Sequence, residues 1–365
     1  PWNAASRLST STAVTGLQTA KAGRRAQRRW VAAAGPGVRI VGMTYYLPAL
    51  AEWLGTQSSV GASIVFDGHD VTPWSPERRA KVGLIRSFQD SALFSTLTVL
   101  ETALVASLAR VPLRIGYATD GRQRLLTHPL PLPEWRETRH EVFYYLNIVA
   151  QLEWLIKHEQ TFLDTQPDGS LEISDVRKTA ARDFLRARGV NEGKLLIALC
   201  PGSVNSRAKR WPTERYAALA DRLIDELGAE VLLVGSSGEA EVSLAVSASM
   251  RNRPVALTGE TDLAELVAVL SLVDLLVTND TGPAHIASAI GRPTLVIFGP
   301  TNPLTTRPFS PFGEIVREPP DCAPCMLRDC PIDHRCMTAI SPDDVYERAR
   351  ALLRSSLETG TEKDA

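Results

Sequence analysis

The sequence lacks three features that would narrow its class at once: an acidic residue before Glu52, a phosphate-binding G-x-x-x-x-G-K-[ST] motif and a long hydrophobic run. Without the Gly-rich motif, the chain cannot hydrolyse ATP by the route of P-loop ATPases. No apolar run approaches the roughly 20 residues that cross a membrane as a helix. The formal net charge of −1 over 365 residues gives no overall attraction to nucleic acid. We therefore expect a cytoplasmic α/β protein, whose 44% hydrophobic content suffices for two cores.

The front of the chain is basic and rich in Ser, Thr and Ala. Such an arm could bind nucleic acid or anionic lipid, but a disordered or chimeric segment is the commoner explanation of this composition. The arm also lacks the apolar core of a secretory signal peptide. We expect residues 1–60 to be a disordered or chimeric segment.

A polar turn near residue 280 separates a buried strand from a helix. Residues 274–278 have the pattern of a short apolar strand, and a helix follows the turn. The free N–H groups and the positive dipole end of that helix suit a phosphate, and the hydroxyl of Thr281 can donate to one. Asp280 and Gly282 flank Thr281, and His285 lies one turn into the helix. On these residues alone, an ordinary capped loop is the alternative.

A second buried strand, residues 195–200, ends in a loop that suits a diphosphate. Gly202 allows a close backbone approach. Lys209 supplies the positive charge that a diphosphate leaving group needs as its bond to a sugar breaks. A third strand, residues 231–234, leads to Glu239, whose carboxylate could bind a ribose hydroxyl. The remaining candidates in the second loop are Ser203, Ser206 and Arg210.

Several long motifs follow one another in order between residues 111 and 353. They are RIGYATDGR, EWRETRHEVFYYL, PGSVNSRAKRWP, VGSSGE, TNDTGPAHIASAIGRPTLVIFGPTNP and CAPCMLRDCPIDHRCM. Their order resembles that of the lipopolysaccharide heptosyltransferases of glycosyltransferase family 9. The resemblance implies a GT-B glycosyltransferase of two α/β domains, in which ADP-heptose binds mainly the C-terminal domain and the acceptor lies across the cleft.

The resemblance also implies roles for the strand-end residues. Lys209 would stabilise the departing diphosphate, and Thr281 would hold its phosphates together with the helix amides. Glu239 would contact the ribose. The other donor-site residues would be Ser203, Ser206, Arg210, Asp280, Gly282 and His285. The family's general base is an N-terminal acidic residue, and we match it to no position of this chain.

The function implied by the resemblance is transfer of heptose from ADP-L-glycero-D-manno-heptose to the lipopolysaccharide inner core. No cofactor is required for this transfer. Because the acceptor is a membrane lipid, the protein would be cytoplasmic with peripheral contact at the inner face of the plasma membrane. The alternative, which follows from the missing base, is a catalytically impaired chimera that binds only ADP-type ligands.

Residues 61–110 resemble a different family. The order GLIRSFQD then LFSTLTVLE is similar to the segment around the Q-loop glutamine of a branched-chain amino-acid ABC transporter ATPase, with Gln89 at the glutamine position. A fragment of an ABC ATP-binding subunit is therefore a further alternative. Neither the phosphate loop nor an LSGGQ-like signature accompanies it.

The hydrophobic pattern predicts a C-terminal domain over residues 179–355, a complete doubly wound parallel sheet that binds the ADP-sugar. Its strands are expected at about 195–200, 230–234, 254–257, 274–278 and 293–298. Its helices are expected at about 213–227, 239–249, 262–272, 283–290 and 341–355. Residues 111–178 would be the remainder of an incomplete N-terminal acceptor-side domain, with a helix at about 138–157, and residues 356–365 a polar tail.

Four of the five cysteines cluster near the C-terminus with His334 among them. The spacing of Cys322, Cys325, Cys330 and Cys336 would allow a thiolate metal site. The two-by-two pairing typical of zinc ribbons is absent, which favours free or loop-packing thiols. Stable disulfides are disfavoured in the cytosol.

Overall fold

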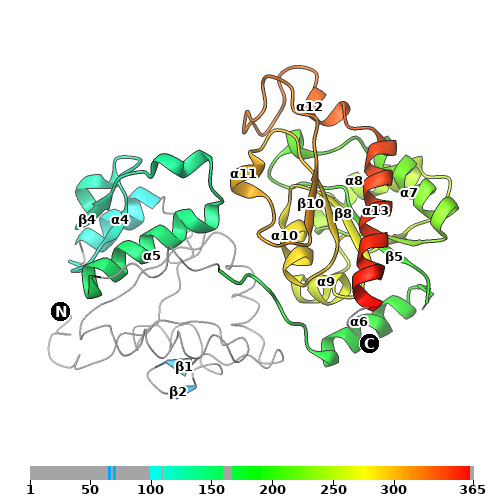
Figure 1. Ribbon diagram of the computed structural model, residues 1–365, viewed down its shortest axis with the longest axis horizontal. Helices are drawn as coiled ribbons and strands as arrows, with labels where there is room; N and C mark the ends of the chain where they lie inside the picture. The colour runs from blue at the N-terminus through cyan, green and yellow to red at the C-terminus, as the bar shows by residue number, and fades with distance from the viewer. Residues whose placement is uncertain are drawn as a thin grey trace. The chain divides into compact units, whose positions relative to one another are not determined.

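The structure, a computed structural model, describes residues 110–158, 167–191 and 193–361, with the short segments 65–66, 69–70 and 99–108. The chain divides into two units, residues 1–167 and 168–365 (Figure 1). The expectations for residues 1–60 and for Gln89 lie outside the described residues. In the part of the chain that is described, no helix combines the length and the apolar character needed to span a bilayer.

The second unit is built on a six-stranded sheet in which every paired strand is parallel to its neighbour. The strand order is β10-β9-β8-β5-β6-β7. The chain thus starts in the middle at β5 and winds outward in both directions, which leaves a crevice at the carboxyl ends of β5 and β8. The strands are β5 (Leu196–Cys200), β6 (Glu230–Leu233), β7 (Val255–Ala256), β8 (Leu275–Asn279), β9 (Thr294–Ile297) and β10 (Gly313–Val316).

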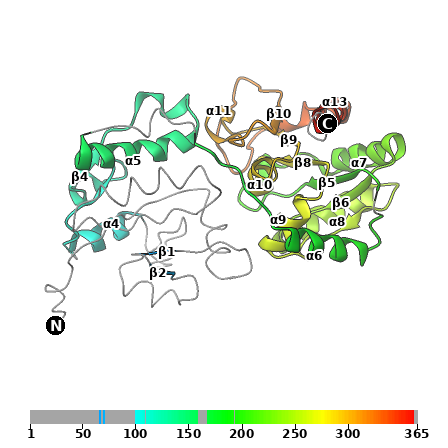
Figure 2. The same ribbon diagram turned by 60° about the horizontal axis from the view of Figure 1, so that its bottom comes forward.

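Helices cover both faces of this sheet (Figures 1 and 2). Alternate residues of β5 point to opposite faces, so Ile197 and Leu199 join one core and Leu196 and Ala198 the other. Strands buried on both faces have continuous apolar sequences, which explains the run of residues 195–200. The helices are α6 (Asp175–Arg186), α7 (Thr213–Leu227), α8 (Ala240–Ser249), α9 (Leu263–Leu270), α10 (Gly282–Ala289), α11 (Pro303–Thr306), α12 (Arg335–Thr338) and α13 (Pro342–Thr361), with the 3-10 turns η4 (Arg207–Lys209) and η5 (Ser237–Glu239).

The doubly wound parallel sheet confirms the predicted fold class, and three details differ from the sequence expectation. Helix α13 continues to Thr361, into the segment 356–365 that was expected to be a polar tail. Strand β10 was not predicted, because its four residues include only two strongly apolar side chains. The second unit begins at Asp168, ahead of the expected boundary at residue 179, and the N–H of Leu171 donates to the Ala289 carbonyl at 2.7 Å. A boundary at residue 179 would cut α6, whose Ala181 and Leu185 pack into the core under β5.

Local signals set the helix limits. Helix α7 begins after Pro212 and ends at Gly228, whose φ of 64° lies in the left-handed region that glycine adopts without steric cost. Helix α9 begins with a capping box, in which Asp262 and Glu265 accept each other's backbone N–H. These signals explain why the predicted helix at 213–227 has the observed bounds.

The first unit, where it is described, contains a pair of parallel strands beside a long helix. That helix, α5, confirms the predicted helix at about 138–157. Its start is set by His140, because the ring Nδ1 accepts a hydrogen bond from the N–H of Val142 at 3.1 Å. The elements are β1 (Val65–Phe66), β2 (His69–Asp70), α4 (Val99–Leu108), β3 (Ile115–Tyr117), η2 (Arg122–Leu125), β4 (His128–Leu130), η3 (Glu134–Glu137) and α5 (Glu141–Lys157).

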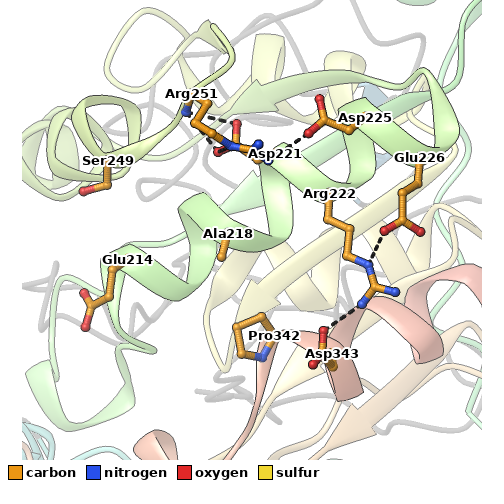
Figure 3. A pocket seen from close by; sticks show the side chains of 10 residues that line it. All are labelled: Glu214, Ala218, Asp221, Arg222, Asp225, Glu226, Ser249, Arg251, Pro342 and Asp343. Carbon is orange, nitrogen blue, oxygen red and sulfur yellow. Dashed lines mark hydrogen bonds and ion pairs between the residues drawn. The ribbon is translucent and has the colours of Figure 1, made fainter.

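A charged hollow of about 530 Å³ lies beside α7, between residues of α8 and α13 (Figure 3). Two arginines in it are bound by carboxylates: Arg222 contacts Asp343 at 2.8 Å, and Arg251 contacts Asp225 at 2.8 Å. The buried Asp221 accepts the backbone N–H groups of Arg251 and Asn252 at 2.9 Å. The residues that line the hollow thus form ion pairs and backbone hydrogen bonds that join α7 to α13 and to the end of α8.

Replacing Asp221 by Ala should lower the free energy of unfolding by about 1–3 kcal/mol, because the backbone donors that it satisfies lose their charged acceptor. Burial alone would raise the pKa of Asp221, but the N–H groups of Arg251 and Asn252 outweigh burial and hold the pKa below its usual value. The stabilisation is therefore complete above about pH 4 and is lost as the pH falls through the lowered folded-state pKa. Urea unfolding of Asp221→Ala at several pH values measures it.

The matched control is Asp225→Ala, because Asp225 is half-exposed and, among the described residues, contacts Arg251 and Asn252 only through their side chains. Asp225→Ala should lower the free energy of unfolding by less than Asp221→Ala does. Equal costs for the two substitutions, or a cost for Asp221→Ala that does not change with pH, would contradict the assignment.

Candidate functional site

The two central strands end side by side, and the buried side chain of Asn279 ties their loops together. Cys200 of β5 and Thr278 of β8 are register partners, so the residues that follow them meet at the crevice. The Asn279 amide donates to the carbonyls of Pro201 at 2.8 Å and Gly202 at 3.1 Å. Its oxygen accepts the N–H of Trp211 and the hydroxyl of Tyr216, each at 3.1 Å. Every hydrogen-bonding position on the amide group is therefore used to hold the β5 loop against β8.

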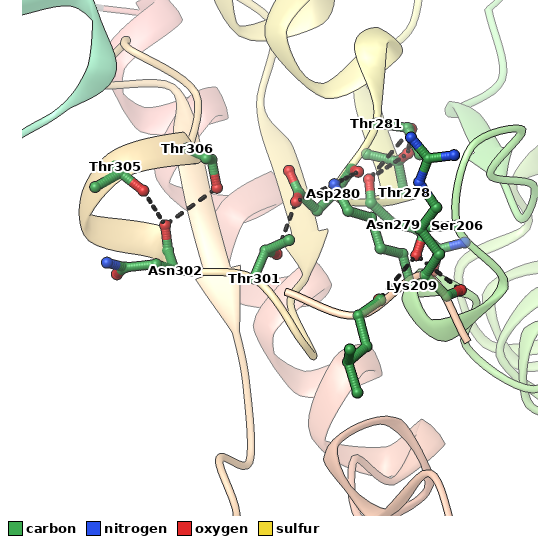
Figure 4. A network of polar contacts seen from close by, with 12 residues as sticks. Ser206, Lys209, Thr278, Asn279, Asp280, Thr281, Thr301, Asn302, Thr305 and Thr306 are labelled. Atoms are coloured by element: carbon green, nitrogen blue, oxygen red, sulfur yellow. Dashed lines mark hydrogen bonds and ion pairs between the residues drawn. The ribbon is translucent and has the colours of Figure 1, made fainter. Parts of the chain in front are cut away.

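Lys209 and Asp280 form an ion pair across these two loops (Figure 4). The Lys209 Nζ lies 2.8 Å from Asp280 Oδ2 and 3.3 Å from the Asp280 carbonyl oxygen. The Thr301 hydroxyl, which follows β9, donates to the same Oδ2 at 2.8 Å. The side chain of Asp280 is only 5% exposed, whereas that of Lys209 is 26% exposed. An ammonium group has three donors, so the two contacts with Asp280 leave a third donor for a ligand.

The start of α10 lies immediately after this ion pair. Thr281 is the N-cap residue, but its side chain does not cap the helix, and the first turn has no acidic residue. Its hydroxyl instead lies 3.1 Å from that of Thr278. At Gly282, an added Cβ would meet no atom within 4 Å. His285 is half-buried one turn into the helix. Pro283 has no N–H, and the N–H of Ala284 donates to the Thr281 carbonyl at 3.1 Å. The helix start therefore offers a phosphate the N–H of Gly282 and the positive dipole end.

Glu239 is buried at the end of β6 and contacts the β5 loop. Its Oε2 accepts the N–H of Ser236 at 2.7 Å and the Ser236 hydroxyl at 2.8 Å. An added Cβ at Gly202 would collide with the Glu239 carboxylate. Gly202, which the sequence indicated as a point of close backbone approach, therefore leaves room for the Glu239 side chain.

Three of the predicted donor-site residues brace the β5 loop. The guanidinium of Arg210 donates to the Ser203 carbonyl at 2.9 and 3.2 Å. The Ser206 hydroxyl donates to the carbonyl of Arg328 at 3.2 Å. Ser203 itself is buried. A contact between these residues and a diphosphate stays a prediction.

The segment that carries four cysteines, residues 321–336, binds the β5 loop and the loop after β9. The carbonyl of Arg328 accepts the N–H of Ala208 at 2.9 Å, and Nε2 of His334 lies 2.6 Å from the Ala208 carbonyl oxygen. The N–H of Met326 donates to the carbonyl of Pro300 at 2.9 Å. The cysteine segment therefore supports the residue before Lys209 and the residue before Thr301.

The cysteines themselves are free thiols that differ in exposure. Cys322 and Cys325 are exposed, whereas Cys336 is buried. Burial, followed by the charges of the neighbouring Cys325 and Cys330, raises the pKa of Cys336 to about 11. Within the described ranges, no three His, Cys, Asp or Glu side chains come together as a group that could hold a metal ion. Cys200 lies in the core, where burial raises its pKa to about 12.

Residues 89–335 match the family described as glycosyltransferase family 9 (heptosyltransferase). The chain belongs to this family. The match begins at residue 89, so the end of the segment that we compared with an ABC ATPase belongs to the glycosyltransferase. The comparison with ABC ATPases gains no support.

Similar proteins of this glycosyltransferase family include lipopolysaccharide heptosyltransferase 2 of Escherichia coli K12, 35% identical over 258 residues, which are 69% of this chain and 72% of the relative. The enzyme of the same name from Salmonella typhimurium is 34% identical, over 60% of this chain and 62% of the relative. The solved structure of E. coli ADP-heptose lps heptosyltransferase II superposes with a TM-score of 0.57 at 27% identity, over 70% of this chain and 74% of the other. These likenesses support the GT-B assignment.

Two residues of the site were missed at the sequence level. Asn279 and Thr301 both lie within a motif that carried the family resemblance, but neither was assigned a role. Thr301 follows β9, which ends at the same edge of the sheet as β5, β6 and β8. The position of a polar residue at a strand end was the available signal.

Replacing Asn279 by Ala should lower the free energy of unfolding by about 2–4 kcal/mol, because several buried polar groups lose their partner at once. Guanidinium unfolding measures the change. The control is Asn191→Ala, since Asn191 is exposed and its side chain, among the described residues, hydrogen-bonds only to Glu230. The effect of this control should be within about 0.5 kcal/mol. A neutral Asn279→Ala would show that the two loops are held by other contacts.

We expect purified protein to contain less than one equivalent of zinc or iron. A thiol reagent at pH 8 should label Cys322 and Cys325 quickly and Cys336 only after unfolding, because the Cys336 thiol is buried and stays protonated far above that pH. Elemental analysis and mass spectrometry of the labelled peptides measure both. A stoichiometric metal lost in Cys325→Ser together with stability would overturn the free-thiol interpretation.

Proposed function

We propose that this glycosyltransferase transfers heptose from ADP-L-glycero-D-manno-heptose to the inner core of lipopolysaccharide. The observation that carries the proposal is the ammonium of Lys209, held by Asp280 at the start of α10. The names of the similar E. coli proteins, a lipopolysaccharide heptosyltransferase and an ADP-heptose lps heptosyltransferase, support the choice of donor and acceptor.

The donor site acts mainly on the leaving group. As the bond between the sugar and the diphosphate breaks, the sugar becomes oxocarbenium-like and negative charge builds up on ADP. The third N–H donor of Lys209, the N–H of Gly282 and the positive dipole end of α10 stabilise that charge. The Thr281 hydroxyl, which donates to the Asn279 carbonyl at 3.3 Å, turns to donate to a phosphate. The positive charge that stabilises the departing ADP thus comes from the Lys209 side chain and the start of α10, and the proposal requires no metal cofactor.

Glu239 supplies a contact for the nucleoside. Its Oε2 is fixed by Ser236, and the carboxylate is held against Gly202 in the β5 loop. A carboxylate at the end of the second strand of such a sheet is the usual partner of ribose hydroxyls. His285 would line the same donor site, one turn into α10.

In this proposal the first unit binds the acceptor. Because the acceptor is a membrane lipid, binding it brings the protein to the cytoplasmic face of the membrane, where the lipid is made. The general base that deprotonates the acceptor hydroxyl is not assigned to a residue. Residues 42–50, whose sequence faintly resembles the family's first strand-to-helix turn, contain no acidic residue. This observation favours a second candidate, a chain that binds ADP-type ligands without transfer.

Replacing Lys209 by Ala should weaken ADP binding about 10- to 100-fold, because a charge-assisted phosphate contact contributes roughly 1.5–3 kcal/mol. Lys194→Ala is the matched control. Lys194 is also ion-paired, with Glu230 at 3.2 Å, but it lies at the amino end of β5. Its affinity for ADP should be unchanged. Calorimetric titration measures both variants, and equal losses would remove the donor-site assignment.

Transfer itself is tested with ADP-heptose and a lipopolysaccharide core acceptor. We expect the rate of ADP release to depend on the acceptor and to be lower for Lys209→Ala. ADP binding without any transfer would favour the second candidate.

A further inference from the structure

Thr301 touches the site without having been assigned a role in it. It lies in the loop after β9 and is only 5% exposed. Its hydroxyl donates to Asp280 Oδ2 at 2.8 Å, the same oxygen that accepts from Lys209 at 2.8 Å. Figure 4 shows Thr301 and Asp280 joined in this way. Two donors from different strand ends therefore converge on one carboxylate oxygen.

We propose that Thr301 is a positioning residue for donor binding, which fixes the Asp280 carboxylate and through it the Lys209 ammonium. The inference rests on the proposed function, because it assumes that Lys209 binds the diphosphate of the donor. Thr301 itself is assigned no contact with the ligand.

The need for such a residue follows from the nature of lysine. Its ammonium is a point charge on a flexible four-carbon stem, so the acceptors around it set its position. Among the described residues, both acceptors of the Lys209 ammonium belong to Asp280. A carboxylate held by one flexible partner can turn about its side-chain bonds, whereas a second donor from a fixed backbone restricts it. The Thr301 hydroxyl is that second donor.

The loop that carries Thr301 is itself held in place. The preceding residue, Pro300, accepts the N–H of Met326 at 2.9 Å. The following residue, Asn302, caps α11 by accepting the N–H of Leu304 at 3.1 Å. Because hydrogen bonds hold both neighbours, the backbone of Thr301 is fixed. Its hydroxyl therefore holds the Asp280 carboxylate in one position.

A neighbouring threonine provides a matched control. Thr305 is also buried, at 3% exposure, and its hydroxyl donates to the carbonyl of Asn302 at 3.0 Å. In the part of the chain that the structure describes, Thr305 makes no hydrogen bond with Asp280 or Lys209. Thr305→Val removes a buried hydroxyl from α11, the helix that follows this loop, while leaving the ion pair intact.

The experiment is a double-mutant cycle on the full chain, with ADP as the probe in calorimetric titrations. The variants are Thr301→Val, Thr301→Ser, Thr305→Val, Lys209→Met and the double variant Thr301→Val/Lys209→Met. We expect Thr301→Val to weaken ADP binding about 5- to 10-fold when Lys209 is present and less than about 2-fold when it is Met, since coupled residues of one network are non-additive. Thr301→Ser, which keeps the hydroxyl, should restore affinity to within about 2-fold of the parent. Thr305→Val should bind ADP as the parent does.

The outcomes separate the inference from the function on which it rests. If the parent chain does not bind ADP, the proposed donor site fails and the inference fails with it. If the parent binds ADP and Lys209→Met weakens binding, but Thr301→Val costs the same in both backgrounds, the proposed function stands and the positioning role is wrong. Should Thr301→Val prove unfolded by thermal melting, Thr301→Ser and Thr301→Cys decide, since only the serine restores a strong donor and only it should keep the parent affinity.

Discussion

The amide of Asn279 joins the ends of the two central strands, and the geometry of the site follows from that junction. Its four hydrogen bonds fix the backbone of Pro201 and Gly202 on one side and the start of α7 on the other. The next residue along the chain, Asp280, is thereby placed opposite Lys209. A strand-order reversal produces a crevice in any sheet of this kind, but the buried amide determines which backbone groups line this one.

Much of the second unit could be predicted because its signals are local. Apolar runs of strand length, a Pro at the entry to α7 and a Gly at its exit act within a few residues, so the strands and the α7 bounds agree with the structure. The same reasoning placed Lys209 and Thr281 at one edge of the sheet, since parallel strands end together. Strand β10 was not predicted, because an edge strand with a half-polar sequence gives little periodic signal.

The contacts that complete the site could not be predicted, because they join distant residues through groups that every sequence contains. Arg328 contributes a backbone carbonyl to Ser206 and Ala208, and no side-chain pattern marks a carbonyl. Thr301 is one threonine among several in its loop, and only the fold shows that its hydroxyl reaches Asp280. The cysteines drew attention to the segment at 321–336, although its contacts with the site loops are made mostly by other residues.

The cysteine segment also has a consequence for how the protein is made. It lies more than a hundred positions after the η4 turn that it supports, at the far end of the second unit. On the ribosome, β5 and the Lys209 loop emerge early, while Arg328 and His334 emerge among the last parts of the fold. The loop that carries the ammonium group therefore lacks its backbone partners until synthesis is nearly complete. A nascent chain that stops before residue 320 would have neither those partners nor the side chains of α12 and α13 that complete one face of the core, so the site and the core are finished together.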